Sequence, residues 1–504
     1  MVARLALLLL ALPAAAQVRA SQTVSATAGG FTGPLADGDR FGVAAAPLGD
    51  LDGDGTPDLA VGAYGDREGR GAVWVLLLRP DGTVRQATAV RLPELAPGDF
   101  FGVALAALGD LDGDGAPELA VGADHADDGG PERGAVWIVS LEPDGRVRAA
   151  HAISATRGGL SDPLADGDLF GHSLATLGDL DGDGTPELAV GADDTSDGGP
   201  RRGAVHVLFL RPDGTVRRSQ RISDTAGGFA GGLDDQDFFG AAVAALGDLD
   251  GDGTPDLAAS ASRDDDGAAD AGAVWVLFLR ADGTVRAHQK ISRTEGRFGG
   301  ELAAGDGFGG TLVAPGDLDR DGTPDLLVGA GGDDRDGPDR GAGWVLSLRP
   351  DGTVRHHQRI GSATPAAGAF ADGDAWMPIA DLDDLDGDGA ADWAWGARLA
   401  DDGGPSRGAA RILFTGYATP SAPSAPDSSL RLVVSPNPAR GRLRLQVQAP
   451  PGAWLAVLDS RGRHVAQLDP TASEIDVSGW PAGVYWLHLG IAGARVARPA
   501  VVVR

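Results

Sequence analysis

One acidic loop recurs six times along this chain of 504 residues. The first copy reads DLDGDGTPD from Asp50, and the others begin at Asp110, Asp179, Asp248, Asp317 and Asp384. The copies lie 60 to 69 residues apart, a period typical of a propeller blade or a similar supersecondary unit. This repeat limits the possible folds more than any other feature of the sequence.

Each unit contains four short apolar runs separated by turn residues. In the first unit FGVAAAPLGDL precedes the acidic loop, PDLAVGA follows it, GAVWVLLL comes third, and an RPDG turn leads into TVRQATAVRL. The third run is apolar throughout, as a strand packed on both faces would be, whereas the fourth alternates and carries arginine. The pattern predicts four-stranded antiparallel units that form a β-propeller. A stacked solenoid is the alternative, but it would need a polar cap that the sequence does not contain.

The two ends of the repeat region complement each other. The sixth unit stops at GAARILFTG and has no fourth run, while SQTVSATAGGF from Ser21 matches SQRISDTAGGF from Ser219. We therefore predict that the N-terminal segment supplies the fourth strand of the last blade. This closure favours an all-β propeller of six blades.

The acidic loop has the composition of a calcium site. Carboxylates occupy positions 1, 3, 5 and 9, glycine at position 6 permits a sharp reversal, and position 7 can offer its backbone carbonyl. Such crowded charges repel one another unless a cation joins them, and a flexible all-oxygen cage suits Ca²⁺ better than Mg²⁺ or Zn²⁺. We predict up to six Ca²⁺ ions; solvated turns are the alternative. The predicted ligands are Asp50, Asp52, Asp54, Thr56, Asp58, Asp110, Asp112, Asp114, Ala116, Glu118, Asp179, Asp181, Asp183, Thr185, Glu187, Asp248, Asp250, Asp252, Thr254, Asp256, Asp317, Asp319, Asp321, Thr323, Asp325, Asp384, Asp386, Asp388, Ala390 and Asp392.

The loop differs from an EF-hand. The bidentate glutamate that an EF-hand carries at position 12 is replaced by an apolar residue in all six copies, beginning with Val61. The flanking segments are also strand-like rather than helical.

The repeat resembles the FG-GAP repeat, which forms the blades of the integrin α-subunit propeller and of many bacterial surface proteins. The resemblance covers roughly residues 20–415, and its FG pairs begin at Phe41, Phe101, Phe170, Phe239 and Phe308. It implies calcium between the first and second strands of each blade. The sixth unit departs from the pattern with Trp376-Met377 and Ala390-Ala391, although its carboxylates remain. Because propellers of this family often have seven blades, seven is the alternative to six.

The regions outside the repeats indicate export. Residues 1–16 read as a secretory signal peptide, residues 17–416 as the propeller, and residues 417–429 as a Pro/Ser/Ala linker. Residues 430–504 contain short alternating runs that predict a small β-sandwich. The motifs SPNPARGRLRL, LDSRGRHVAQL and IDVSGWPAGVYWLHL resemble the C-terminal sorting domain of type IX secretion substrates, which implies the outer-membrane secretion machinery as a partner; an ordinary adhesive domain is the alternative. We expect a secreted or cell-surface protein.

Composition excludes several function classes. The formal net charge of −30 would repel nucleic acid, and no segment beyond the signal peptide is apolar enough to cross a membrane. Cysteine is absent, so no disulfide can stabilise an exported fold.

Catalytic motifs are also missing from the sequence. It contains no HExxH, GxSxG or GxxxxGK[ST], and Lys290 is its single lysine. His206 stands where other units have tryptophan, which indicates a strand residue rather than a base. We expect a non-catalytic module for binding, adhesion or scaffolding; the alternative is a calcium-dependent, lyase-like enzyme acting on polysaccharides.

The unknown protein or glycan ligand is expected on the face opposite the calcium loops. Longer loops that vary between units gather there, and such loops on a rigid scaffold commonly carry recognition. They are acidic, which suggests a basic or cation-bridged partner, with simple solubility loops as the alternative. The acidic residues are Asp127, Asp128, Asp193, Asp194, Asp264, Asp265, Asp333 and Asp334.

Overall fold

The computed structural model describes residues 16–364, 366–417, 431–435, 442–448, 454–459, 464–469, 471–480, 483–491 and 494–502. The chain divides into two compact units, Met1–Tyr417 and Ala418–Arg504. The predicted signal peptide lies outside the described residues except for Ala16, and the predicted linker except for Tyr417.

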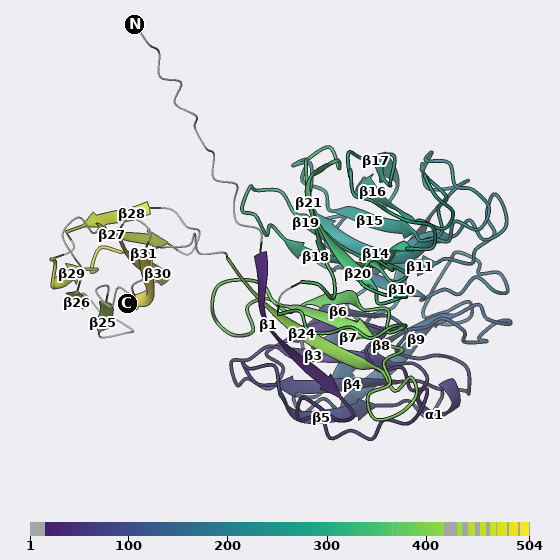
Figure 1. Cartoon of the computed structure of the whole chain (residues 1–504), viewed down its shortest axis with the longest axis horizontal. Coiled ribbons are helices and arrows are strands. Elements are labelled where there is room, and N and C mark those ends of the chain that lie inside the picture. Colours follow the sequence, from purple (N-terminus) through teal and green to yellow (C-terminus); the bar gives the residue numbers. More distant parts are fainter. Residues whose placement is uncertain are drawn as a thin grey trace, which may run out of the picture. The chain divides into compact units, whose positions relative to one another are not determined.

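Five blades of the first unit each consist of four consecutive antiparallel strands (Figure 1). Blade 1 contains β2 (Ala45–Gly49), β3 (Asp58–Ala63), β4 (Ala72–Leu78) and β5 (Val84–Val90). Blade 2 contains β6 (Leu105–Gly109), β7 (Glu118–Ala123), β8 (Ala135–Leu141) and β9 (Val147–Ser154). Blade 3 contains β10 (Ser173–Gly178), β11 (Glu187–Ala192), β12 (Ala204–Leu210) and β13 (Val216–Ser223). Blade 4 contains β14 (Phe239–Gly247), β15 (Asp256–Ala261), β16 (Ala273–Leu279) and β17 (Val285–Ile291). Blade 5 contains β18 (Phe308–Gly316), β19 (Asp325–Ala330), β20 (Ala342–Leu348) and β21 (Val354–Ile360).

The sixth blade joins the two ends of this unit, as Figure 1 shows for the purple β1 beside the green β24. It contains β22 (Met377–Asp381), β23 (Trp393–Ala397), β24 (Ala409–Tyr417) and β1 (Ala16–Ser25). Ser25 pairs with Ala409 at one end of β1, and Ala16 with Tyr417 at the other. The innermost strand β22 packs beside β2, which completes the ring. The prediction of six blades closed by the N-terminal strand is confirmed for the described residues.

The core of the propeller is a ring of six hydrophobic clusters, each shared by neighbouring blades. The phenylalanine of every FG pair is completely buried in one of them, and Trp376 replaces it in blade 6. The backbone of Phe101 lies against Gly71 of the preceding blade, where a Cβ atom would stand 2.0 Å from the Phe101 carbonyl oxygen. Glycine at this point therefore lets neighbouring blades approach closely.

A short irregular turn, α1 (Asp66–Gly69), lies in the connection from β3 to β4, and its residues Arg67 and Glu68 have positive φ. Third strands such as β4 are buried along their whole length, whereas fourth strands such as β5 have exposed residues in the middle. These patterns agree with the inner and outer strands that the sequence predicts.

The second unit is also made of strands. One sheet contains β25 (Arg431–Ser435), β26 (Arg442–Gln448) and β29 (Glu474–Asp476). The other contains β28 (His464–Leu468), β27 (Trp454–Asp459), β30 (Gly483–Ile491) and β31 (Ala494–Val502). Their shared core includes Leu443, Leu455, Val457 and Leu487. In the part of the chain that the structure describes, no helix is long and apolar enough to cross a membrane.

Candidate metal centres and central cavity

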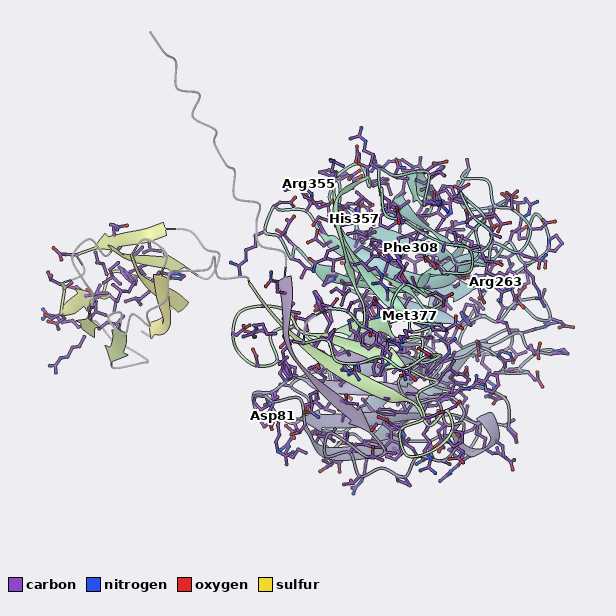
Figure 2. All side chains as sticks on the ribbon, in the orientation of Figure 1. Asp81, Arg263, Phe308, Arg355, His357 and Met377 are labelled. Atoms are coloured by element: carbon purple, nitrogen blue, oxygen red, sulfur yellow. The ribbon has the colours of Figure 1, made fainter. Side chains whose placement is uncertain are left out.

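The strand order places two kinds of connection on opposite faces of the propeller. The acidic loops, between first and second strands, share one face with the turns between third and fourth strands. The other face carries the connections between second and third strands and those between blades. In Figure 2, Asp81, from a turn of the first kind, and Arg263, from a connection of the second kind, lie on opposite sides of the propeller.

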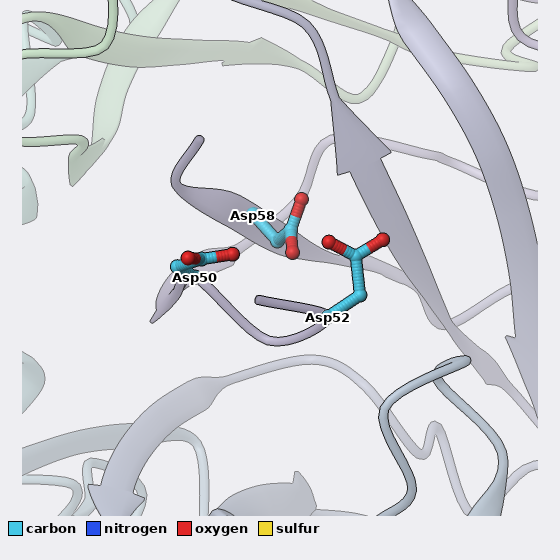
Figure 3. Close-up of side chains that lie close together, drawn as sticks. All are labelled: Asp50, Asp52 and Asp58. Carbon is cyan, nitrogen blue, oxygen red and sulfur yellow. The ribbon is translucent and has the colours of Figure 1, made fainter. Parts of the chain in front are cut away.

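The acidic loop of blade 1 gathers three of its predicted ligands (Figure 3). One oxygen from each of Asp50, Asp52 and Asp58 lies within 4.8 Å of the others. Backbone N–H groups hold the loop in this shape, because Gly55 donates to Asp50 at 2.8 Å and Thr56 donates to Asp54 at 2.9 Å. The convergence therefore follows from the loop backbone rather than from chance orientation of the side chains.

The same hydrogen bonds recur in every acidic loop. Position 6 donates to position 1 at 2.7–3.0 Å, and position 7 donates to position 5 at 2.8–2.9 Å. Carboxylate triads like that of blade 1 are present in the next four blades: Asp110, Asp112 and Glu118; Asp179, Asp181 and Glu187; Asp248, Asp250 and Asp256; and Asp317, Asp319 and Asp325. The loop of blade 6 keeps the same hydrogen bonds despite its irregular sequence.

The carboxylate at position 9 is buried in all six loops. In blade 1, Asp58 accepts hydrogen bonds from the backbone N–H groups of Leu51 and Leu78, so it ties the loop to the third strand. Burial outweighs these bonds and raises the pKa of Asp58 to about 6 and that of Asp325 to about 7. A nearby cation would relieve this cost, because it would favour the charged form.

Two carboxylate oxygens of blade 3 are free to bind a cation. Asp181 Oδ1 and Glu187 Oε1 are buried and have no hydrogen-bond partner. Buried polar atoms without a partner are uncommon and call for an explanation such as an ion. The donor set is made entirely of oxygen, which fits Ca²⁺.

An arginine beside each loop was not foreseen from the sequence. It comes from the fourth strand and pairs with the carboxylate at position 5, as Arg217 does with Asp183 at 2.9 Å. Position 5 is not among the triad residues of blades 1 to 5. In blades 1, 3, 4 and 6 the same arginine also pairs with the carboxylate at position 3. The Val-Arg pair, in GTVR or GRVR after the RPDG-like turns of blades 1 to 5 and in AQVRA near the N-terminus, is the signal that could have revealed it. The six pairs are Arg85–Asp54, Arg148–Asp114, Arg217–Asp183, Arg286–Asp252, Arg355–Asp321 and Arg19–Asp388.

Blade 6 adds a carboxylate beside its loop. Asp381 stands where the other blades have proline, alanine or threonine. Burial raises its pKa to about 8, helped by the charges of Asp383 and Asp392, and its Oδ1 atom has no hydrogen-bond partner.

A cavity of about 1130 Å³ lies on the ring axis, on the face opposite the acidic loops. All six blades line it, each through the residue that follows its second strand. These residues are Tyr64, Asp124, Asp193, Ser262, Gly331 and Arg398. The residue before the FG pair also lines it in five blades, with φ between 54° and 62°: Arg40, Phe100, Phe238, Gly307 and Ala375.

A cluster of two half-buried histidines and two buried aspartates lines the cavity. Asp124 lies 2.9 Å from Nδ1 of His125 and 2.8 Å from Nδ1 of His172, while Nε2 of His172 is 3.6 Å from Asp193. Burial alone would lower the pKa of His172, but Asp193 and Asp124 outweigh it and raise the pKa to about 9. The pKa of His125 is also raised, because Asp124 outweighs burial. Both imidazoles are therefore more readily protonated than an ordinary histidine.

Most of the acidic residues predicted to charge this face are paired with cations. Asp128 bonds to Ser154 and Thr156 and pairs with Arg157 at 3.1 Å. Asp333 pairs with two arginines, and Asp264 lies 2.7 Å from the single lysine, Lys290. Because these carboxylates are already paired, they favour a basic ligand less than the sequence suggests. The sequence pattern did not reveal the pairing, because most of the paired cations lie in other segments of the chain. His206 lies fully buried in β12, with Nδ1 3.1 Å from Asp162.

The fold and the acidic loops define a repeat propeller, and comparison with known families identifies the repeat. An FG-GAP-like repeat matches residues 50–121, and the FG-GAP repeat matches residues 170–208, 239–277 and 309–346. The secretion system C-terminal sorting domain matches residues 433–502. The chain thus carries FG-GAP repeats followed by a sorting domain of the type IX secretion system, as the two resemblances implied.

Integrin α subunits are among the similar proteins. The chain is 31% identical to integrin alpha-5 of Xenopus laevis over 226 residues, which are 44% of this chain and 20% of that protein. It is 46% identical to human integrin alpha-IIb over 85 residues, 17% of this chain and 8% of that protein. It is 36% identical to integrin alpha-PS2 of Drosophila melanogaster over 168 residues, 31% of this chain and 12% of that protein. The matches thus span a fifth or less of these relatives.

Two solved structures are distantly similar. PorZ, a bacterial surface component of the type IX secretion system of Porphyromonas gingivalis, is 13% identical with a TM-score of 0.36, over 94% of this chain and 61% of that one. The rhamnogalacturonan lyase YesW is 16% identical with a TM-score of 0.36, over 78% of this chain and 75% of that one.

Proposed function

We propose that this protein is an exported, calcium-stabilised propeller that acts as a non-catalytic binding, adhesion or scaffold module at the cell surface or outside the cell. The observation that carries the proposal is the division of the ring into two faces. One face repeats the same carboxylate cage, and the other surrounds a large cavity with residues that vary between blades.

The calcium part rests on the donors themselves. In each loop the residues at positions 1, 3 and 9 would hold the ion; in blade 3 these are Asp179, Asp181 and Glu187. The bound ion would supply positive charge that neutralises these carboxylates and relieves the repulsion between them. Position 5 would join them only if it released its arginine, and position 7 would contribute its carbonyl oxygen.

The export part rests on the ends of the chain. The sorting domain indicates delivery to the cell surface or the surroundings. We propose a signal peptide at residues 1–16, the propeller at 17–416, a linker at 417–429 and the sorting domain at 430–504. The secretion machinery of the outer membrane would then be the partner of the sorting domain.

A lyase-like enzyme is the second candidate, because Tyr64, His125 and His172 all line the cavity and a tyrosine or histidine can act as a base. The electrostatics oppose this role. The raised pKa values of both histidines favour the protonated forms, which donate protons instead of accepting them. The cavity is better suited to hold a ligand than to abstract its proton.

The test is to compare binding and turnover on the same ligands. The full chain would be incubated with panels of glycans and extracellular proteins, with calcium and with a chelator, and each glycan would be examined for cleavage. We expect calcium-dependent binding of at least one ligand without cleavage. Cleavage of a bound glycan would instead support the enzyme, and calcium-free preparations that behave identically would refute the role of the ion.

A further inference from the structure

The central cavity carries cations in a strongly acidic protein. Arg40, Arg263 and Arg398 line it, and none of them forms an ion pair with a carboxylate among the described residues. By contrast, the arginines beside the acidic loops are all paired. A chain with a net charge of −30 has ample carboxylates to pair them, so three unpaired guanidinium groups around one cavity point to an anion from outside.

Aromatic rings lie next to these cations. Tyr64 and Phe100 meet edge to face with centroids 5.2 Å apart, and Phe100 meets His125 at 4.6 Å. The guanidinium of Arg40 lies over the Tyr64 ring and bonds to its hydroxyl, while Arg263 lies over Phe238 at 4.9 Å. These contacts hold Arg40 and Arg263 in place, and the half-buried rings offer apolar surface to a ligand.

The part of the cavity around blade 5, between the blades of Arg263 and Arg398, provides space and hydrogen-bond acceptors. Gly305 and Gly307, in the connection from blade 4 to blade 5, and Gly331 of blade 5 line the cavity without side chains of their own. Asp270 and Asp339 lie beside them, are exposed, and form no ion pair with the described residues. Their carboxylates can accept hydrogen bonds from hydroxyl groups but would repel a second anion.

A ligand that satisfies both the arginines and the two aspartates must carry an anionic group and several hydroxyls. We propose that the cavity binds an acidic sugar unit, a monosaccharide residue bearing a carboxylate or sulfate, with its anion on Arg398 and Arg263 and its hydroxyls on Asp270 and Asp339. The planar arginine fork matches such anions in two hydrogen bonds. An acidic peptide would also satisfy the arginines, but its further carboxylates would be repelled by the two aspartates. This inference rests on the proposed binding function and names the class of its ligand.

The test uses the full chain with calcium and three matched sugars. Titration calorimetry would compare a trimer of galacturonic acid, the neutral trimer of galactose and a sulfated galactose trimer. We expect at least one acidic trimer to bind about tenfold or more tightly than the neutral one, with the gap narrowing at high salt. Tighter binding of the galacturonic acid trimer would identify a carboxylate as the preferred anion, and tighter binding of the sulfated trimer would identify a sulfate.

Matched variants locate the site. Arg398→Gln and Arg263→Gln should each weaken binding by about tenfold to a hundredfold, the usual effect of losing a charge-assisted hydrogen bond. Arg146→Gln, in an exposed turn on the other face, should not change it. All three variants should keep the parent's melting temperature, which excludes misfolding as the cause.

Several outcomes would overturn the inference. The inference fails if the acidic and neutral trimers bind equally or if neither acidic trimer binds. It also fails if Arg398→Gln and Arg263→Gln bind as tightly as the parent, or if a glutamate-rich peptide binds more tightly than the acidic trimers. If other ligands still bound this face with calcium, the inference would fail while the proposed function stood. If the chelator changed neither stability nor binding, the calcium role would fail independently of the sugar result.

Discussion

The two faces of this propeller use the same repeat in opposite ways. On one face, six loops repeat their carboxylates and hydrogen bonds with little change, even in the irregular blade 6. On the other, the residue after the second strand is tyrosine, aspartate, aspartate, serine, glycine and arginine in turn. Positions that every blade needs for its own stability are alike, and positions that meet at the axis are free to differ. The differences therefore mark where a single ligand can be recognised by the whole ring.

Removing calcium should have the largest effect. At about 100 times the dissociation constant, each site contributes about 2.7 kcal/mol, while the net stability of a folded protein is about 5–15 kcal/mol. We expect a chelator to lower the melting temperature strongly, with recovery in Ca²⁺ and poor recovery in Mg²⁺. An unchanged melt measured by calorimetry would show that the loops are not occupied sites.

Removing one ligand should have a smaller effect, confined to one blade. Asp52→Ala takes one carboxylate from the triad of blade 1 and leaves the other five loops intact. We expect the loss of about one bound ion, measured by native mass spectrometry, and a modest fall in melting temperature. Asp81→Ala, in a turn on the same face, is the control and should bind as many ions as the parent. Unchanged stoichiometry in Asp52→Ala would mean that Asp52 is not a ligand.

The cavity face should respond to pH through His172. Its pKa is raised in the folded protein, so its protonation stabilises the fold fully below the ordinary histidine pKa, and this stabilisation is lost as the pH rises through about 9. Asp124, Asp193, His125 and Arg398 act on the same imidazole. We expect His172→Gln to lower the melting temperature at pH 6, with a difference that shrinks toward pH 9.5. A constant difference across this range would contradict a charged His172 in the fold.

The sequence predicted the propeller because its signals are local and repeated. Four apolar runs, the FG pair and the acidic loop recur in register, and the match between Ser21 and Ser219 revealed how the ring closes. The convergence of positions 1, 3 and 9 could also be predicted, since glycine at position 6 and carboxylates at fixed spacing shape the loop, whereas the pairing of position 5 with an arginine of the fourth strand could not.

The cavity could not be predicted in the same way, because it depends on residues from different blades. Arg398 and His172 are more than two hundred residues apart in the sequence, yet both line the cavity. No spacing rule connects Lys290 with Asp264, or Asp333 with Arg359, before the blades are placed. The residue after each second strand is easy to locate in the sequence, but only the structure shows that these six residues meet around the ring axis. Internal divergence at an otherwise repeated position is the sequence signal that could have directed attention there.

The loop arginines should produce the smallest effect and sharpen the account of the metal face. Arg85 pairs with Asp52 and with Asp54 across 3.2 Å, so it partly offsets the negative charge that calcium would also neutralise. Because one cation repels another, Arg85→Gln should bind calcium slightly more tightly in blade 1 and be slightly less stable when calcium is removed. Calcium titrations and melts with chelator would measure the two shifts, with Arg146→Gln as the control for a paired arginine in a turn away from the triad. If Arg85→Gln weakened calcium binding instead, the arginine would be supporting the cage rather than competing with the ion.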